Sequence, residues 1–230
     1  MWVKVCGLRE PDNIRAVASL GVDFIGFVFC PSDERYVKMI NSQAGIIPDY
    51  SAERLEKCQA GEEKNAETSA RFPQKVGVFA DDMPQNIVTR VYNYHLDVVQ
   101  LNGDESPVMI DNLRRTLDPD IREGIKIIKT LHVRTEEDLA DWKRYEGHAD
   151  LFLFEFPGEG SADRVEWRLL DAYGGGIPFL IGGGISRKDV GDIKAFRHPL
   201  FVGVDVNEGF ETAPAVKSVE DIRCFVDALK

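Results

Sequence analysis

The sequence has few of the residues that build metal sites or disulfide frameworks. It contains four cysteines and four histidines in 230 residues. The cysteines show no CxxC spacing and no companion cluster of histidines, and they lie at Cys6, Cys30, Cys58 and Cys224. This pattern does not fit a zinc site and favours reduced thiols in a cytoplasmic protein. We therefore expect no bound metal.

Basic charge and long apolar runs are also scarce. The 28 lysines and arginines are outnumbered by 39 acidic residues, which gives a formal net charge of -11. Because such a surface repels polyphosphate and anionic lipid, we expect no nucleic-acid partner and no membrane partner. No apolar run approaches the roughly 18 residues needed to cross a bilayer. The first residues enter a strand pattern without a basic leader, so we expect no targeting signal.

The hydrophobic content of 43% is nevertheless enough for one large core, and we expect residues 1–230 to form a single domain. Eight short apolar segments fit β-strands, at residues 3–6, 22–29, 75–79, 97–101, 125–130, 150–155, 178–181 and 201–204. Apolar residues at three- and four-residue spacing fit helices between and after them, at residues 11–20, 84–94, 107–117, 136–145, 165–173, 186–196 and 218–229.

This alternation predicts a parallel sheet. The segment 22–29 is apolar throughout except for Asp23, as expected of a strand buried on both faces. Eight such strands with their crossovers match the (β/α)8 TIM barrel in number and length. A doubly wound open sheet is the alternative, but it usually has fewer strands. We predict the barrel.

One segment, residues 41–72, departs from the rhythm because Glu, Lys, Ala, Ser and Gln dominate it. We interpret it as an elaborated polar second crossover. It would hold a helix at 51–59 with Ser51 as its N-cap, followed by a solvated loop at 60–70. We assign it no function.

Chemically useful residues stand at the predicted carboxyl ends of the strands, which form the active face of such a barrel. They are Cys6, Arg35, Gln100, Asn102, Glu155 and Asp205. A cysteine here is either a packed thiol or a catalytic one. Lys4 points to the same face two residues earlier, and it either helps Cys6 to ionise or forms a structural ion pair inside the barrel.

Glycine-containing loops follow the last two strands. Gly182, Gly183 and Gly184 precede a helix, and Gly209 lies in the loop after the final strand. Backbone amides in such loops can approach a ligand closely, and (β/α)8 barrels often bind phosphate at this place. Either run alone fits an ordinary turn. Together they predict a site for a small phosphorylated substrate.

A series of short motifs runs in a fixed order along nearly the whole chain. They are KVCGL at 4–8, DFIGFVF at 23–29 with RYV at 35–37, VGVF at 76–79, VQLNGDE at 99–105, IGGGI at 181–185, GVD at 203–205, and ETAPAVK at 211–217. In this order and spacing the chain resembles the phosphoribosylanthranilate isomerase family of tryptophan biosynthesis.

The resemblance implies a cofactor-free isomerase that performs an Amadori rearrangement on N-(5-phosphoribosyl)anthranilate. Cys6 would be the base that removes the C2 proton, and Glu155 the acid that protonates the ribose ring oxygen. Arg35 would pair with the anthranilate carboxylate, and Asp205 would orient the amine. The implied substrate-binding set is Arg35, Gln100, Asn102 and Asp205, and the phosphate-binding set is Gly182, Gly183, Gly184, Glu208 and Gly209. Relatives occur as monomers and as dimers, so we expect a monomer or a homodimer.

The chain departs from the family pattern at the active face. Glu155 stands where the family has aspartate, and Asn102 where it commonly has histidine. Asn207 and Glu208 replace two serines, and the Glu208 carboxylate would repel a phosphate unless only its amide faces the ligand. Three readings stay open: an isomerase with compensating substitutions, a barrel isomerase of another sugar phosphate, and a non-catalytic relative that binds a phosphorylated ligand. We favour the first, because Cys6, Arg35, Asp205 and a carboxyl group at strand six all remain.

Overall fold

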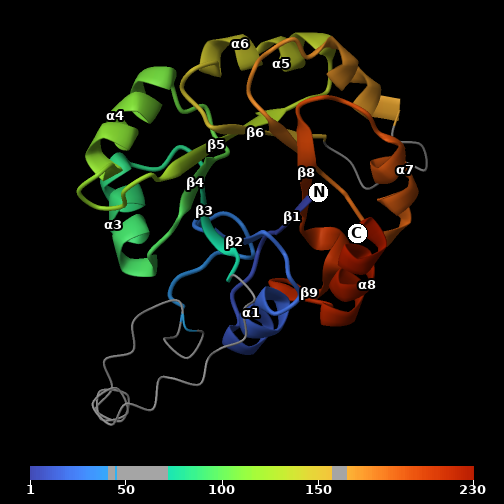
Figure 1. Cartoon of the computed structure of the whole chain (residues 1–230). Helices are drawn as coiled ribbons and strands as arrows, with labels where there is room; N and C mark the ends of the chain where they lie inside the picture. Colours follow the sequence, from blue (N-terminus) through green and yellow to red (C-terminus); the bar gives the residue numbers. More distant parts are fainter. Residues whose placement is uncertain (41–44, 46–71, 157–164) are drawn as a thin grey trace.

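The computed structural model describes residues 1–40, 45, 72–156 and 165–230. Eight parallel strands close into a barrel in chain order, and the helices surround it (Figure 1). The barrel strands are β1 (Trp2–Val5), β2 (Phe24–Val28), β3 (Gln74–Phe79), β4 (Val98–Leu101), β5 (Lys126–His132), β6 (Leu151–Glu155), β7 (Phe179–Gly182) and β8 (Phe201–Val206). The predicted (β/α)8 TIM barrel is confirmed.

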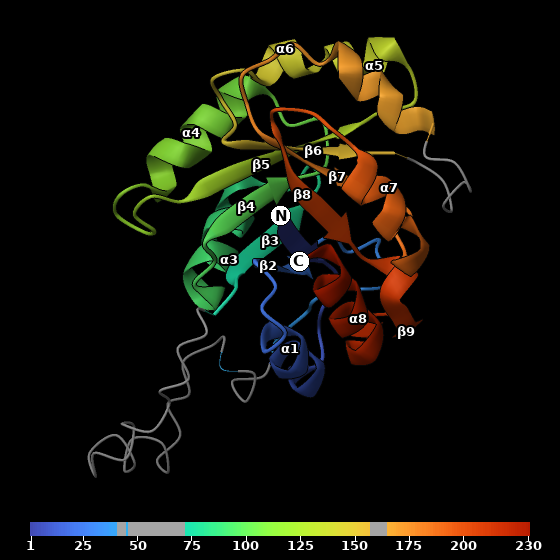
Figure 2. The ribbon, with the colours of Figure 1, turned by 45° about the vertical axis from the view of Figure 1, so that its right-hand side comes forward.

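The α-helices follow the strands on the outside, as Figure 2 also shows. They are α1 (Pro11–Ala18), α3 (Pro84–Tyr94), α4 (Pro107–Leu117), α5 (Glu136–Ala140), α6 (Trp142–Tyr145), α7 (Val190–Ala195) and α8 (Val219–Leu229). Proline at the first turn starts α1, α3 and α4, where its missing N–H costs nothing. Ser218 caps α8 by accepting from the Asp221 amide.

Two apolar layers hold the barrel. The larger layer lies between strands and helices and includes Phe27, Phe154 and Phe179. The smaller one fills the barrel interior with Val76, Leu153 and other branched side chains. The smaller layer closes the interior of the barrel, so a ligand can bind only at the ends of the barrel.

Several elements differ from the prediction. Residues 136–145 form two short helices, since α5 ends at Ala140 and Asp141 separates it from α6. Residues 165–172 form a 3-10 helix (Val165–Ala172). Its buried residues Trp167 and Leu170 are three apart, and three residues per turn bring them to one side. A 3-10 turn (Arg187–Asp189) precedes α7.

The end of the chain contains a hairpin that the pattern did not predict. A short 3-10 turn (Glu208–Phe210) leads into β9 (Glu211–Ala213) and its antiparallel partner β10 (Val216–Lys217). Strand β8 also runs two residues further than predicted, so Asp205 lies within the strand. The predicted helix at 51–59 and loop at 60–70 lie outside the described residues.

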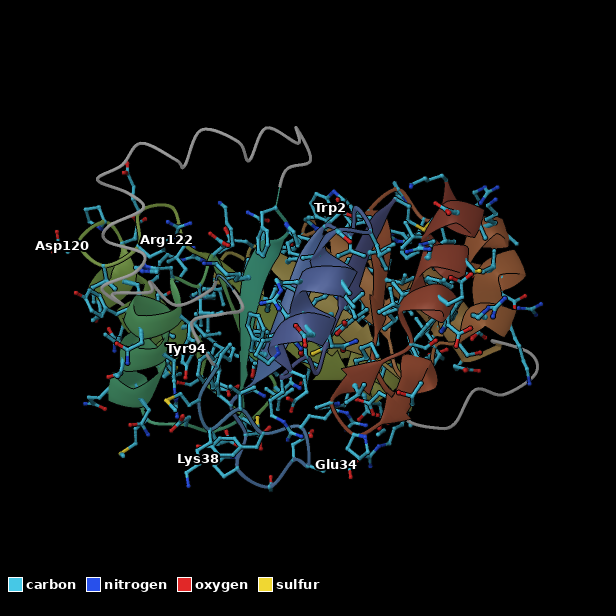
Figure 3. The ribbon with its side chains drawn as sticks, turned by 90° about the horizontal axis from the view of Figure 1, so that it is seen from below. Trp2, Glu34, Lys38, Tyr94, Asp120 and Arg122 are labelled. Carbon is cyan, nitrogen blue, oxygen red and sulfur yellow. The ribbon has the colours of Figure 1, made fainter. Side chains whose placement is uncertain are left out.

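The two ends of the barrel are far apart. In Figure 3, Trp2 at the amino end of β1 lies opposite Glu34 and Lys38, which follow β2. The carboxyl ends of all eight strands therefore meet on the side of Glu34 and Lys38.

Candidate active site

A cavity opens at the carboxyl ends of the barrel strands. Its lining contains most of the predicted site residues. They are Cys6, Gln100, Asn102, Glu155, Gly183, Gly184, Asp205, Glu208 and Gly209. It also contains Asn207, which the sequence marked only as a departure from the family pattern, and Cys30 and Asp33, which the sequence did not assign to the site. Arg35 and Gly182 do not line it.

Cys6 follows β1 and is buried at the floor of the cavity. Its amide donates to the carbonyl oxygen of Val206 at 2.9 Å. A Cβ atom on Gly26 would come within 2.9 Å of the Cys6 sulfur, so glycine at that place makes room for the thiol. Burial raises the pKa of Cys6, while the charges of Lys4 and Lys217 oppose that rise. The resting group is a thiol with two cations close enough to stabilise its thiolate.

Lys4 forms an ion pair inside the barrel. Its Nζ donates to Asp205 Oδ2 at 2.6 Å, and the lysine side chain is fully buried. Although burial lowers the pKa of Lys4, the charges of Asp205 and Cys6 raise it above its ordinary value. The structure shows the ion pair of Lys4, and the same ammonium group opposes the rise in the pKa of Cys6. The second carboxylate oxygen, Asp205 Oδ1, is buried without a hydrogen-bond partner among the described residues.

Glu155 ends β6 on the far side of the cavity from β1. It is the register partner of His132 at the end of β5. Its Oε2 lies 3.0 Å from His132 Nδ1. The Glu155 side chain is 36% exposed, so it is neither fully buried nor turned out of the cavity that Cys6 lines.

A small polar cluster lies between these two sides. Gln100 Nε2 donates to Asn102 Oδ1 at 2.8 Å and to Thr130 Oγ1 at 3.2 Å. Thr130 Oγ1 in turn donates to Asn102 Oδ1 at 2.6 Å. The remaining amide oxygen, Gln100 Oε1, is buried with no hydrogen-bond donor in the described part of the chain. A buried acceptor of this kind at a cavity can accept a hydrogen bond from a hydroxyl or amine group of a ligand.

Arg35 is occupied by acidic neighbours. Its Nε and Nη2 donate to the two carboxylate oxygens of Glu211 at 2.9 and 2.8 Å, and Nη1 lies 3.5 Å from Asp33 Oδ1. These hydrogen bonds raise the pKa of Arg35. Glu211 also accepts from Lys217 Nζ at 2.7 Å. The guanidinium thus ties the loop after β2 to β9, a contact that the sequence prediction did not include.

The glycine loops lie side by side. Gly183 and Gly184 have φ values of +92° and +56°, where side-chain-bearing residues are strained. A Cβ on Gly209 would collide with the carbonyl oxygen of Ile185, so the second loop packs closely on the first. Gly182 belongs to β7, and a Cβ there would point at Leu153 Cδ1 at 3.0 Å, toward the barrel interior. That direction explains why Gly182 does not line the cavity.

Glu208 turns its carboxylate outward. The side chain is 59% exposed, and its Oε2 lies 3.9 Å from Arg35 Nη2. The backbone of Glu208 follows Asn207, whose Oδ1 accepts from Lys217 Nζ at 2.6 Å. The Glu208 carboxylate therefore lies near a cation and in contact with solvent.

Within the described ranges, no group of three His, Cys, Asp or Glu side chains is arranged to hold a metal ion. In the same ranges, no helix has the length and apolar character of a membrane span.

The fold and the cavity define a class of protein: single (β/α)8 barrels that carry acid–base groups and glycine loops at the carboxyl ends of their strands. A family model described as "N-(5'phosphoribosyl)anthranilate (PRA) isomerase" matches residues 32–228. The chain belongs to this family.

Individual relatives agree with that membership. The N-(5'-phosphoribosyl)anthranilate isomerase of Parabacteroides distasonis is 35% identical over 100% of this chain and 93% of its own length. That of Phocaeicola vulgatus is 33% identical over 100% of this chain and 98% of its own length. The crystal structure of phosphoribosyl anthranilate isomerase from Thermus thermophilus superposes with a TM-score of 0.70 at 25% identity, covering 100% of this chain and 98% of that one.

Proposed function

We propose that the chain converts N-(5'-phosphoribosyl)anthranilate to the corresponding aminodeoxyribulose phosphate in tryptophan biosynthesis, with Cys6 as base and Glu155 as acid. The observation that carries this assignment is one cavity with the buried thiol of Cys6 on its β1 side and the carboxyl of Glu155 on its β6 side. An acid and a base on opposite sides of a small sugar can act on different atoms of it.

The reaction begins with ring opening. Glu155 gives its proton to the ribose ring oxygen, the bond from C1 to that oxygen breaks, and the nitrogen lone pair forms a C1=N iminium. The Cys6 thiolate then removes the proton from C2, and the electron pair of that C–H bond forms a C1=C2 enamine. Transfer of a proton to C1 and loss of the C2 hydroxyl proton give the ketone. Atoms balance as an isomerisation, and no cofactor is required.

The thiolate of Cys6 is available only in part at neutral pH, because burial raises the pKa of this thiol. Lys4 and Lys217 stabilise the anion once it forms. The positive charge of the iminium next to C2 stabilises the Cys6 thiolate further. We therefore expect the base to be active as a minor ionised species that the bound intermediate favours.

The substrate's phosphate would lie against Gly183, Gly184 and Gly209, since their loops meet at the cavity and leave room for the backbone to approach an anion. Glu208 would contribute its backbone only. Gln100 and Asn102 would contact the substrate from the β4 side of the cavity, and Asp205 would contact the amine from β8.

The anthranilate carboxylate would approach the Arg35 side of the mouth. Arg35 already shares two donors with Glu211, so substrate binding there requires the remaining donors or a shift of the acidic neighbours. We place the enzyme in the cytoplasm as a monomer or homodimer, with the small phosphorylated substrate as its ligand.

The direct test follows the fluorescence of phosphoribosylanthranilate after addition of the purified protein. We expect the fluorescence to fall with a rate proportional to protein concentration. Binding without consumption would instead indicate a non-catalytic relative. Consumption only of another aminoaldose phosphate would indicate a related isomerase.

A further inference from the structure

A histidine that does not itself line the cavity contacts Glu155, the residue that does, and the proposed reaction does not use it. His132 is the last residue of β5 and Glu155 the last of β6, so the register brings them side by side. Their side chains meet at 3.0 Å between Nδ1 and Oε2. The other ring nitrogen, Nε2, lies 3.2 Å from the carbonyl oxygen of Asn102.

This geometry selects one protonation state of the ring. Both partners, a carboxylate oxygen and a carbonyl oxygen, are hydrogen-bond acceptors. Neutral imidazole has one N–H and can satisfy only one of them, whereas the imidazolium ion donates to both. The ring of His132 is therefore best satisfied when it carries the proton that the carboxyl group of Glu155 would otherwise need to hold.

The groups around His132 favour its protonated state on balance. The hydrogen bond to Glu155 raises the pKa of His132, and burial lowers it. The Asn102 carbonyl adds to the rise, and Lys129 on the same strand opposes it. Across the barrel, Asp205 on β8 interacts with Glu155 through its charge. The net pKa of His132 is raised, which extends its protonated state toward neutral pH.

A carboxyl group without a partner is a poor acid at neutral pH. An isolated glutamate side chain is ionised at neutral pH and has no proton to give. A histidine–carboxylate pair retains one proton up to the higher of its two macroscopic titrations. The pair can thus serve as an acid in a pH range where a carboxyl group alone is already ionised.

We propose that His132 is a positioning residue for Glu155, which fixes Oε2 and keeps within the pair the proton that Glu155 delivers to the substrate. This inference rests on the proposed function. The proton passes from His132 Nδ1 to Glu155 and from Glu155 to the ring oxygen, whose bond to C1 breaks. The pair is left as neutral imidazole and carboxylate. Solvent then restores the proton through His132, which is 49% exposed.

The test is the pH profile of kcat/KM for the wild type and for His132→Gln. His148→Gln is the matched control, because His148 forms a similar pair with Asp111 at 2.8 Å, and Asp111, unlike Glu155, does not line the cavity. For His132→Gln we expect the fall in kcat/KM at high pH to move to lower pH. The loss then grows with pH and reaches about tenfold or more at pH 8, carried by kcat with KM unchanged. His148→Gln should follow the wild type.

An unchanged profile, or a loss by the same factor at every pH, would overturn the role of His132. NMR titration of the imidazole signals provides a second measurement that needs no substrate. The pKa of His132 should return toward that of an ordinary histidine in Glu155→Gln, and a pKa that stays raised would contradict the pairing. If the wild type fails to consume the substrate, the proposed function fails, whatever this titration shows.

Discussion

The two sides of the barrel mouth treat charge in different ways. On the β1–β8 side, Lys4 and Asp205 are paired deep in the barrel beside the buried thiol of Cys6. On the β5–β6 side, Glu155 and His132 are 36% and 49% exposed. A base that takes a proton from carbon benefits from fixed charges and the exclusion of water. An acid that must be reloaded in each cycle benefits from contact with solvent.

Breaking the buried ion pair of Lys4 and Asp205 should reduce the stability of the protein more than breaking an exposed ion pair. Lys4→Met leaves the Asp205 carboxylate buried without its cation, and we expect a loss of about 3–5 kcal/mol in the free energy of unfolding. Urea denaturation measures it. Lys126→Met is the control, because Lys126 pairs with Asp150 at 3.4 Å on the surface, and it should change stability by less than about 1 kcal/mol. Equal effects would mean that the two pairs do not differ as their burial indicates.

On the exposed side, Glu155→Asp tests whether the longer carboxyl group is required. The aspartate is one methylene shorter, so it cannot keep both the bond to His132 and its place in the cavity. We expect kcat to fall about tenfold, since a small displacement in a preorganised site is expensive. Steady-state kinetics by fluorescence checks this. Activity equal to or above that of the wild type would show that the site does not depend on the glutamate–histidine pair.

The smallest effect is expected at Glu208. Because its carboxylate points outward toward Arg35, Glu208→Gln should change KM by no more than about twofold, as for other surface substitutions. KM is measured at several phosphate concentrations to detect competition at the glycine loops. A large decrease in KM would show instead that the Glu208 carboxylate faces the bound phosphate and repels it.

Much of the fold was predictable, because continuous apolar segments separated by helical spacing have few other solutions. The exact ends of the strands were harder to predict. The predicted fifth strand ended at Thr130, although apolar Leu131 follows it. The backbone ladder continues to His132, since Glu155 on the neighbouring strand extends the pairing. That two-residue difference is why the sequence did not indicate His132.

The residues lining the cavity were predictable where one strand end supplied each of them. Cys6, Asn102 and Glu155 belong to this kind. The contact between Arg35 and Glu211 joins positions 176 residues apart through a hairpin that has no strong strand signal. Short β9 pairs with β10 and has no apolar pattern, so no local feature of the sequence indicates that Arg35 is occupied.

The role of the buried side can be tested with a single-turnover rate, measured with enzyme in excess over phosphoribosylanthranilate. Cys224→Ala serves as the matched control, because Cys224 lies on α8, where its thiol donates to Glu220. We predict that Cys6→Ala lowers the rate about 1,000-fold with nearly unchanged thermal stability, while Cys224→Ala keeps the wild-type rate. A wild-type rate in Cys6→Ala would contradict the assignment of this thiol as the base.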